Sequence, residues 1–198
     1  ERYLHDPASV DVATRAFFER WTPPEPAPST AEAAAAPVTA TPDIAKVVAA
    51  AHSVDALVVA DNTFLSPALQ RPLALGCDLV VHSTTKYING HSDVVGGAVV
   101  TRSPALTEQV RWWANCLGIT GAPFDSWLTL RGLRTLHARL RVQQESALAV
   151  VAALSAHPAV AKVYHPSLPD HPGHDIAKAQ ADGFGAMVSF ELRGGLEA

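Results

Sequence analysis

Two short apolar runs in this sequence, residues 57–60 and 77–81, each end in side chains that can do chemistry. The first run is followed by a carboxylate, Asp61, and the second by segment 83–86, which reads Ser-Thr-Thr-Lys. Apolar runs of this length are typical of fully buried strands. Because ligands of open α/β sheets bind at the carboxyl ends of parallel strands, these side chains predict a ligand site at one edge of a sheet.

The residue types match the needs of pyridoxal phosphate. This cofactor takes a lysine for a Schiff base, a carboxylate beside its pyridine nitrogen, and hydroxyl donors for its phosphate. Of the four lysines, only Lys86 lies among hydroxyl groups at a strand end, so we predict that it is the catalytic Schiff-base lysine. Asp61 supplies the carboxylate, and Ser83 and Thr85 supply the hydroxyl groups. Taken singly, the same residues also fit a solvated lysine and an aspartate that caps a turn.

A metal site is the weaker interpretation of the same segment. His82, His91 and Asp93 are of metal-binding type, but they lie on one glycine-containing loop without the fixed spacing of known sites. We therefore predict no metal. His91 and Asp93 are expected to brace the loop through hydrogen bonds.

Composition limits the classes of function. Apolar residues make up 48% of the 198, whereas a net charge of −4 gives no electrostatic footprint for nucleic acid. Cys77 in a predicted strand and Cys116 in a predicted helix are expected to be inert core thiols of a cytoplasmic protein. Neither a signal peptide nor an 18-residue apolar run occurs, so no membrane association is expected. The chain begins with Glu1 rather than Met, which suggests a missing or internal segment.

Capping residues and periodicity predict the surrounding elements. Asp43 and Ser103 are expected to cap helices over 44–52 and 105–116. A helical turn or two, ended by Gly76, is expected over 66–75. Further strands are predicted over 97–101, 160–165 and 185–192. Helices between apolar strands indicate a doubly wound α/β sheet.

The longest helical pattern covers residues 123–157. Gly132 lies inside it, at a cost of about 1 kcal/mol relative to alanine, and is expected to mark a kink or a close contact. A basic run on this helix is interpreted as a solvated or subunit-facing surface, with a phosphate site as the alternative. Its members are Arg131, Arg134, Arg139 and Arg141.

Residues 43–192 resemble the cysteine/methionine-metabolism family of pyridoxal-phosphate enzymes, and most closely its branch that makes cystathionine. The motif HSTTKYINGHSDVVGG, residues 82–97, is similar to the family's lysine signature. The resemblance continues through DNTFLSPALQRPLALG, WWANCLGITGAPFDSWLTLRGLRTL, YHPSLPDHPGH and GFGAMVSFEL. It covers about three quarters of the chain in order, which makes it specific.

The resemblance gives each site residue a role. It implies that Lys86 carries the cofactor, that Asp61 pairs with the pyridine nitrogen, and that Thr63 lies near the ring. Ser83 and Thr85 would contact the phosphate. The implied reaction replaces the γ-ester of an O-acyl-homoserine with cysteine to give cystathionine, and a γ-lyase or homoserine-ester sulfhydrylase activity is the alternative. The implied partners are these amino acids and further copies of the chain, as a dimer or tetramer with active sites at subunit interfaces.

Periodicity, composition and the resemblance together divide the chain into segments. They are a helical segment 1–21, a Pro/Ala-rich linker 22–42, the cofactor-binding half of an aspartate-aminotransferase-like large domain 43–122, a connecting helix 123–157, and the start of a small α+β C-terminal domain 158–198. Ala36 falls where the family has an asparagine that contacts the cofactor. The family's phosphate loop, ring-stacking tyrosine and carboxylate-binding arginine have no match. A truncated, non-catalytic remnant that acts only in oligomer assembly therefore stays open.

Overall fold

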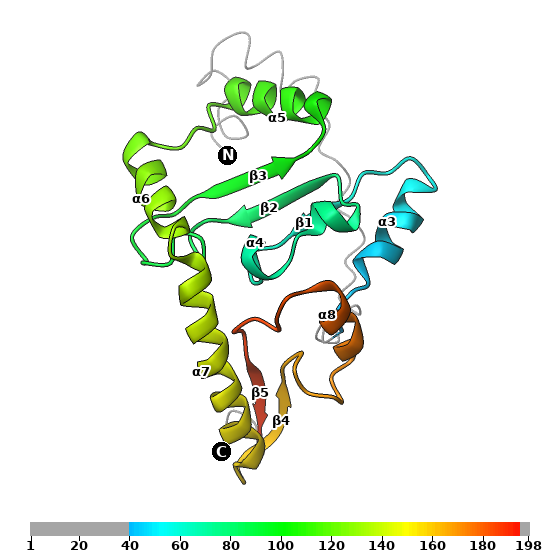
Figure 1. The fold of residues 1–198 in the computed structure, drawn as a ribbon, viewed down its shortest axis with the longest axis vertical. Helices are drawn as coiled ribbons and strands as arrows, with labels where there is room; N and C mark the ends of the chain where they lie inside the picture. The colour runs from blue at the N-terminus through cyan, green and yellow to red at the C-terminus, as the bar shows by residue number, and fades with distance from the viewer. Residues whose placement is uncertain (1–39, 195–198) are drawn as a thin grey trace, which may run out of the picture. The chain divides into compact units, whose positions relative to one another are not determined.

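The computed structural model describes residues 40–194. The predicted helix over 1–21, nearly all of the linker over 22–42 and the position of Ala36 lie outside the described residues. In the described part, the chain forms a three-stranded sheet with helices, followed by a two-stranded sheet packed beside a long helix (Figure 1). The α/β class is therefore as predicted.

Strands β1 (Val59–Asp61), β2 (Leu79–Ser83) and β3 (Gly97–Thr101) form the first sheet in that order. β1 runs parallel to β2, and β3 runs antiparallel to β2. The first two strands begin two residues later than the apolar runs predict, so Ser83 lies at the end of β2 rather than after it. A short helix α4 (Ser66–Leu69) and the 3₁₀ helix η2 (Pro72–Leu75) make the parallel connection.

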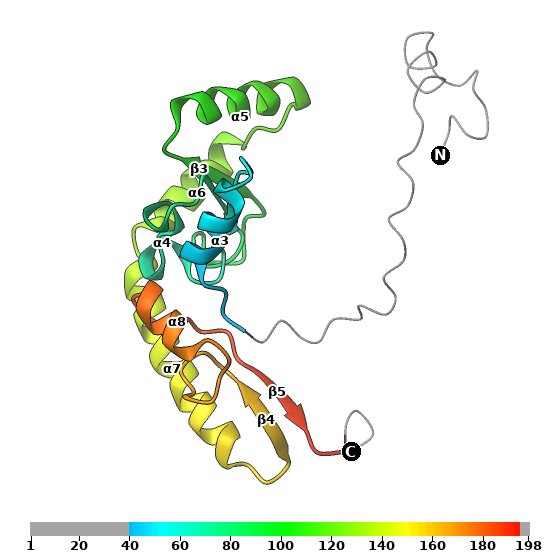
Figure 2. The same ribbon diagram turned by 90° about the vertical axis from the view of Figure 1, so that its right-hand side faces the viewer.

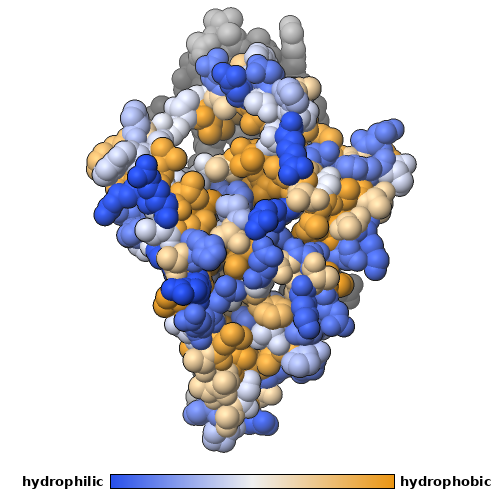
Figure 3. Space-filling view, viewed as in Figure 1, coloured by the Kyte–Doolittle hydropathy of each residue, from blue (hydrophilic) through white to orange (hydrophobic). Residues whose placement is uncertain are grey.

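The prediction that both apolar runs are fully buried is wrong for the first. Val80 in the central strand β2 is only 3% exposed, whereas Val59 in β1 is 57% exposed. The two strands differ in exposure because of their places in the sheet. β2 lies between two strands, whereas β1 lies at the edge and one of its faces has no cover within residues 40–194. Figure 3 shows hydrophobic residues exposed on the face of the molecule that Figure 1 presents.

Helix α3 (Ile44–His52) begins where its cap predicts, because the Asp43 carboxylate accepts a hydrogen bond from the Lys46 N–H at 3.1 Å. Ile44 and Val48 pack with Cys77 in a small core cluster. Val47, which lies between them in the sequence on a neighbouring part of the helix surface, is 48% exposed. Cys77 is a buried thiol as predicted, but it precedes β2 instead of belonging to it.

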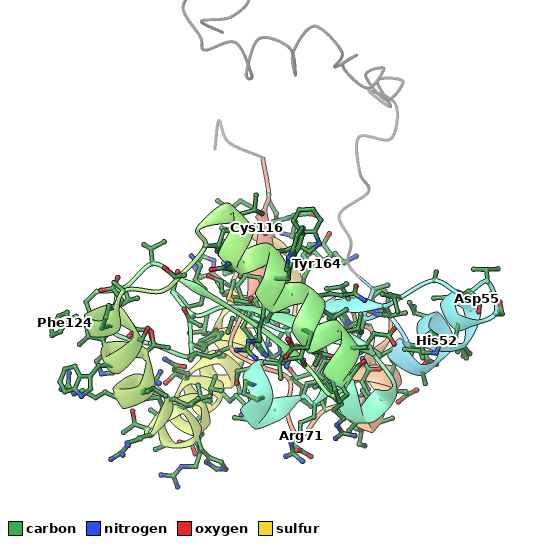
Figure 4. The ribbon with its side chains drawn as sticks, turned by 90° about the horizontal axis from the view of Figure 1, so that it is seen from above. His52, Asp55, Arg71, Cys116, Phe124 and Tyr164 are labelled. Carbon is green, nitrogen blue, oxygen red and sulfur yellow. The ribbon has the colours of Figure 1, made fainter. Side chains whose placement is uncertain are left out.

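Helix α5 (Pro104–Leu117) lies beside β3 and is capped by Ser103, whose hydroxyl accepts from the Leu106 N–H at 3.3 Å. Cys116 lies on this helix but is exposed, which corrects its assignment as a core thiol (Figure 4). The reason is that α5 has no fully buried residue among those described. Its apolar side chains, which include Trp112 and Trp113, remain at the surface.

The predicted long helix over 123–157 is two helices, α6 (Pro123–Leu133) and α7 (Leu136–Ala156). The break lies two residues after Gly132, whose backbone meets the Asn89 carbonyl so closely that an added Cβ would be 2.2 Å from that oxygen. The predicted close contact at Gly132 is therefore confirmed. The buried stripe of α7 consists of Leu136, Leu140, Ala147 and Val151.

Beyond α7, strands β4 (Val160–Tyr164) and β5 (Ser189–Leu192) pair antiparallel (Figure 2). β5 is shorter than the run over 185–192 predicts. Helix α8 (His174–Gln180) was not predicted, because the prolines before it indicate a loop. It begins after Gly173, whose left-handed backbone (φ 87°) allows the turn into the helix. Within residues 40–194, no helix is both long and apolar enough to span a membrane.

Candidate active site at the strand ends

The ends of β1 and β2 are joined by a chain of hydrogen bonds through Thr63. The Asp61 Oδ1 atom accepts from the Thr63 hydroxyl at 2.6 Å and from the Thr63 N–H at 3.0 Å. The Thr63 hydroxyl oxygen in turn accepts from the Ser83 N–H at 2.8 Å. Parallel pairing of Asp61 with Val81 brings these positions to one edge of the sheet. The structure therefore brings together three of the five predicted site residues.

These bonds set the charge state of Asp61. The side-chain and backbone hydrogen bonds from Thr63, aided by the nearby His82 ring, lower the pKa of the Asp61 carboxyl. Asp61 is thus a carboxylate at neutral pH. His82 itself is buried in β2, and that burial lowers its pKa. Within residues 40–194 its Nδ1 atom has no hydrogen-bond partner.

Lys86 lies on a tight turn directly after β2. Its N–H donates to the Ser83 carbonyl at 3.3 Å, and its own carbonyl accepts from the Gly90 N–H at 2.8 Å. A further bond from the Asn89 N–H to the Thr84 carbonyl at 2.9 Å closes the turn. We call residues 86–90 the lysine turn. The Lys86 side chain is exposed and forms no ion pair with a residue of the described part.

Thr85 and Ser83 differ in how far their hydroxyl groups are already engaged. The Thr85 hydroxyl accepts from the Gly96 N–H at 3.0 Å and donates to the Gly96 carbonyl at 3.3 Å. It therefore ties the lysine segment to the start of β3. For the Ser83 side chain the described residues provide no such partner, which leaves its hydroxyl the freer of the two.

Lys86 and Thr85 line an open recess of about 650 Å³, within the size range of small-molecule sites. Phe64, Gln143 and Met187 also line it, so that the loop after β1, helix α7 and the segment before β5 all contribute. Asp61, Thr63 and Ser83 are not part of this lining. The predicted residues thus form two neighbouring groups, a strand-end group and a recess group.

The loop after the lysine turn is braced as the sequence predicts. The Asn89 amide donates to the Asp93 carboxylate at 2.7 Å, and the His91 Nδ1 lies 2.7 Å from the Asn89 carbonyl. In the described ranges, no three side chains of histidine, cysteine, aspartate or glutamate are grouped to hold a metal ion.

Arg139 is the residue that sequence reasoning misplaced. Its guanidinium is turned inward, where it donates to the carbonyls of Tyr87, Ile88 and Gly132. The interpretation of the basic run as solvated or subunit-facing is therefore wrong for this member, whereas Arg131, Arg134 and Arg141 are exposed.

The residues present fit pyridoxal phosphate by their chemistry. A carboxylate with a lowered pKa suits a protonated pyridine nitrogen, and a lysine beside a recess suits an aldehyde. Hydroxyl groups and backbone N–H groups at the strand ends suit a phosphate. Fold and donor set together define an α/β enzyme domain with a ligand site at the carboxyl ends of its parallel strands.

Comparison with known proteins identifies the family. Residues 5–198 match the family model described as "Cys/Met metabolism PLP-dependent enzyme". Cystathionine gamma-synthase of Escherichia coli is 59% identical over 152 residues, which are 77% of this chain. Cystathionine beta-lyase of Coxiella burnetii is 49% identical over 152 residues, which are 76% of this chain. The chain belongs to the pyridoxal-phosphate-dependent Cys/Met metabolism family.

A solved structure supports the same conclusion for the fold. Cystathionine gamma synthase from Xanthomonas oryzae, in complex with aminoacrylate and cysteine, superposes with a TM-score of 0.78 and 63% sequence identity. The match covers 80% of this chain and 41% of that one. The matched regions of the E. coli and C. burnetii relatives are each 39% of their length. The chain thus spans about two fifths of the relatives that it matches.

Proposed function

We propose that the protein uses pyridoxal phosphate to replace the γ-ester of an O-acyl-homoserine with cysteine, giving cystathionine. The observation that carries the proposal is the site itself, a lysine beside a recess next to an aspartate held as a carboxylate at the neighbouring strand end. The 59% identity to a cystathionine gamma-synthase favours this reaction within the family. A γ-lyase or a homoserine-ester sulfhydrylase is the alternative. The γ-lyase alternative is supported by similarity to a cystathionine gamma-lyase at 46% identity.

The residues divide the work. When bound, pyridoxal phosphate withdraws electrons from the α-carbon of the amino acid. Lys86 would bind the cofactor covalently and, once displaced by the substrate amine, would take a proton from the α-carbon and then one from the β-carbon, so that the γ-ester leaves as a carboxylate. The cysteine thiol would lose its proton and add at the γ-carbon, and Lys86 would return protons to the β- and α-carbons. Asp61, whose ionised form is stabilised by the hydrogen bonds from Thr63, would accept a hydrogen bond from the pyridine N–H and keep that proton in place. The Ser83 hydroxyl would donate to the phosphate, and the Thr85 hydroxyl would do so by exchanging the Gly96 carbonyl for a phosphate oxygen.

The proposal includes the oligomeric state and the cellular compartment of the protein. Exposed apolar side chains on α5 and α6 support assembly into a dimer or tetramer with active sites at subunit interfaces. Two free cysteines, Cys77 and Cys116, favour a reducing compartment such as the cytoplasm. A non-catalytic remnant that acts only in oligomer assembly is the second candidate function, and the same exposed apolar side chains support it.

The test is a covalent map of the cofactor. We expect purified protein, incubated with pyridoxal phosphate and reduced with borohydride, to carry one phosphopyridoxyl group on Lys86 by peptide mass spectrometry. Lys86→Ala should lack it, and the matched variant Lys178→Ala should keep it. Cystathionine formation from an O-acyl-homoserine and cysteine should depend on Lys86 as well. Absence of the adduct at saturating cofactor, or its attachment to another lysine, would overturn the proposal, and an adduct without turnover would favour the remnant.

A further inference from the structure

Arg139 connects helix α7 to the lysine turn through a set of short hydrogen bonds. Its Nη1 donates to the Tyr87 carbonyl at 2.8 Å, and its Nη2 donates to the Ile88 carbonyl at 3.2 Å. The Nη2 group also donates to the Gly132 carbonyl at 2.7 Å, and Nε donates to the Thr135 hydroxyl at 3.1 Å. One guanidinium thus joins the turn that carries Lys86, the end of α6 and the start of α7.

The partners of Arg139 explain why an arginine is needed. Three of its four acceptors are backbone carbonyls, and within residues 40–194 it forms no ion pair with a carboxylate. The Gly132 carbonyl belongs to the last turn of α6, where the helix dipole favours a cation. A planar guanidinium can reach several carbonyls at once, whereas the lysine ammonium is a single point of charge.

Two glycines let the backbones approach. A Cβ at Gly90 would lie 1.9 Å from the Arg139 Nη1 atom, and a Cβ at Gly132 would lie 2.2 Å from the Asn89 carbonyl oxygen. At Gly132 helix α6 and the turn therefore touch without an intervening side chain, whereas Gly90 leaves room for the Arg139 guanidinium. The Gly90 N–H also closes the lysine turn on the Lys86 carbonyl.

From this geometry we propose that Arg139 is a positioning residue, which holds the backbone of the lysine turn so that the Lys86 amine stays directed into the recess. The proposal rests on the function assigned above to Lys86. It acts through the Tyr87 and Ile88 carbonyls, which follow Lys86 directly, and requires no contact between Arg139 and the cofactor. Losing the guanidinium would leave the Tyr87 and Ile88 carbonyls without their donor and free the turn to sample other conformations.

The experiment separates the position of Lys86 from the affinity for the cofactor. The variants are Arg139→Gln, Arg139→Lys and, as the matched control from the same helix, the exposed Arg141→Gln. The rate of the covalent reaction is followed at saturating pyridoxal phosphate. Non-covalent affinity is measured with pyridoxine 5′-phosphate, which has an alcohol in place of the aldehyde and cannot bond to lysine.

We expect Arg139→Gln to slow the covalent reaction about tenfold or more, because small misplacement of a reacting group costs rate steeply. Affinity for pyridoxine 5′-phosphate should stay close to that of the wild type. Arg139→Lys should recover little of the rate, and Arg141→Gln should match the wild type in both measurements. A wild-type rate in Arg139→Gln would overturn the inference, as would equal losses of rate and affinity.

Hydrogen exchange without cofactor gives a second, independent readout. In Arg139→Gln, the Asn89 and Gly90 amides should exchange faster than in the wild type, while amides of α3 remain unchanged. Unchanged exchange in the turn would contradict the positioning role even if the protein bound no cofactor at all. If the wild-type protein forms no adduct on Lys86, the proposed function is refuted. The hydrogen-exchange result then still tests whether Arg139 holds the lysine turn.

Discussion

Thr63 makes the hydrogen bonds that hold the strand-end group, Asp61, Thr63 and Ser83, together. This is a larger structural role than its predicted place near the cofactor ring suggests. Its hydroxyl donates to the Asp61 carboxylate and accepts from the Ser83 N–H, so that one side chain connects the ends of two parallel strands. Thr63 is 7% exposed, which makes each of these bonds costly to leave unmade. Its position therefore affects both the charge of Asp61 and the geometry of β2.

We expect Thr63→Val to lower the free energy of unfolding by about 1–3 kcal/mol, because the buried Ser83 N–H then lacks its acceptor. The pKa of Asp61 should rise toward its ordinary value, since the largest cause of its lowering is the Thr63 hydroxyl. Urea unfolding and an NMR titration of the Asp61 carboxyl measure the two effects. Thr63→Ser keeps the hydroxyl and serves as control. An unchanged Asp61 titration in Thr63→Val would show that another group sets its charge.

Among single residues, the sequence allowed prediction of those whose proposed chemistry follows from the type of side chain. Lys86 and Asp61 could be chosen because, together with the hydroxyl groups of Ser83 and Thr85, they supply each type of group that pyridoxal phosphate needs. Arg139 could not, because its partners are backbone carbonyls, and every residue has one. The engagement of the Thr85 hydroxyl by Gly96 was likewise invisible, since it depends on the antiparallel pairing of β3.

Elements with a local cause were predicted well, and elements with a distant cause were not. Helices α3 and α5 were placed within one residue, because their caps, Asp43 and Ser103, lie directly before them. The break between α6 and α7 was missed as a break, because the apolar spacing continues across it. What ends α6 is the contact of Gly132 with the lysine turn, which lies more than forty residues earlier in the chain.

Gly132→Ala tests that contact, because the substitution should raise the helix propensity of α6 but also create a steric clash with the lysine turn. Alanine favours a helix over glycine by about 1 kcal/mol. The new Cβ, however, would lie 2.2 Å from a backbone oxygen that cannot move aside as a side chain can. Overpacking of this kind costs about 1–3 kcal/mol, so we expect net destabilisation in urea unfolding. Gly97→Ala, whose Cβ would meet only ordinary contacts, is the control, and a stabilised Gly132→Ala would refute the close packing.

For the molecule as a whole, exposure was the property that the sequence could not predict. The run over 57–60 reads as a buried strand because it is apolar, yet burial depends on whether another element covers it. Within the described residues nothing covers one face of β1, and Leu57 is 59% exposed. Hydrophobic pattern therefore predicted the α/β class and the neighbourhood of the strands, but not which faces are covered.

Buried histidines make the stability of the whole fold depend on pH. His165 is fully buried, and burial lowers its pKa, with the nearby positive charge of His171 acting in the same direction. Its Nδ1 atom accepts from the Ser167 N–H at 3.2 Å, which places the proton of the neutral ring on Nε2. Burial also lowers the pKa values of His82 and His171.

The sign of the effect follows from these lowered pKa values. As the pH falls below about 6.5, the unfolded chain takes up protons before the folded protein does. The contribution to stability is therefore complete above that pH and is lost as the pH falls through the lower folded values. We expect the free energy of unfolding to fall as the pH drops below about 6.5, by at most about 1.4 kcal/mol per pH unit for each such histidine.

Urea unfolding across this range measures the slope. His165→Asn should reduce it, whereas replacing the exposed His137 by asparagine should not. Equal slopes in wild type and His165→Asn would contradict the assigned role of His165, whatever the stability of the variant at neutral pH.

The exposed aromatic side chains of α5 and α6 have an optical consequence. Three of the four tryptophans, Trp112, Trp113 and Trp127, lie on these two helices and are each more than half exposed. Indole emission shifts to shorter wavelengths when water is removed from around the ring. Coverage of this surface by another copy of the chain, or by any other polypeptide, would therefore be recorded directly in the colour of the protein's own fluorescence, without an added label.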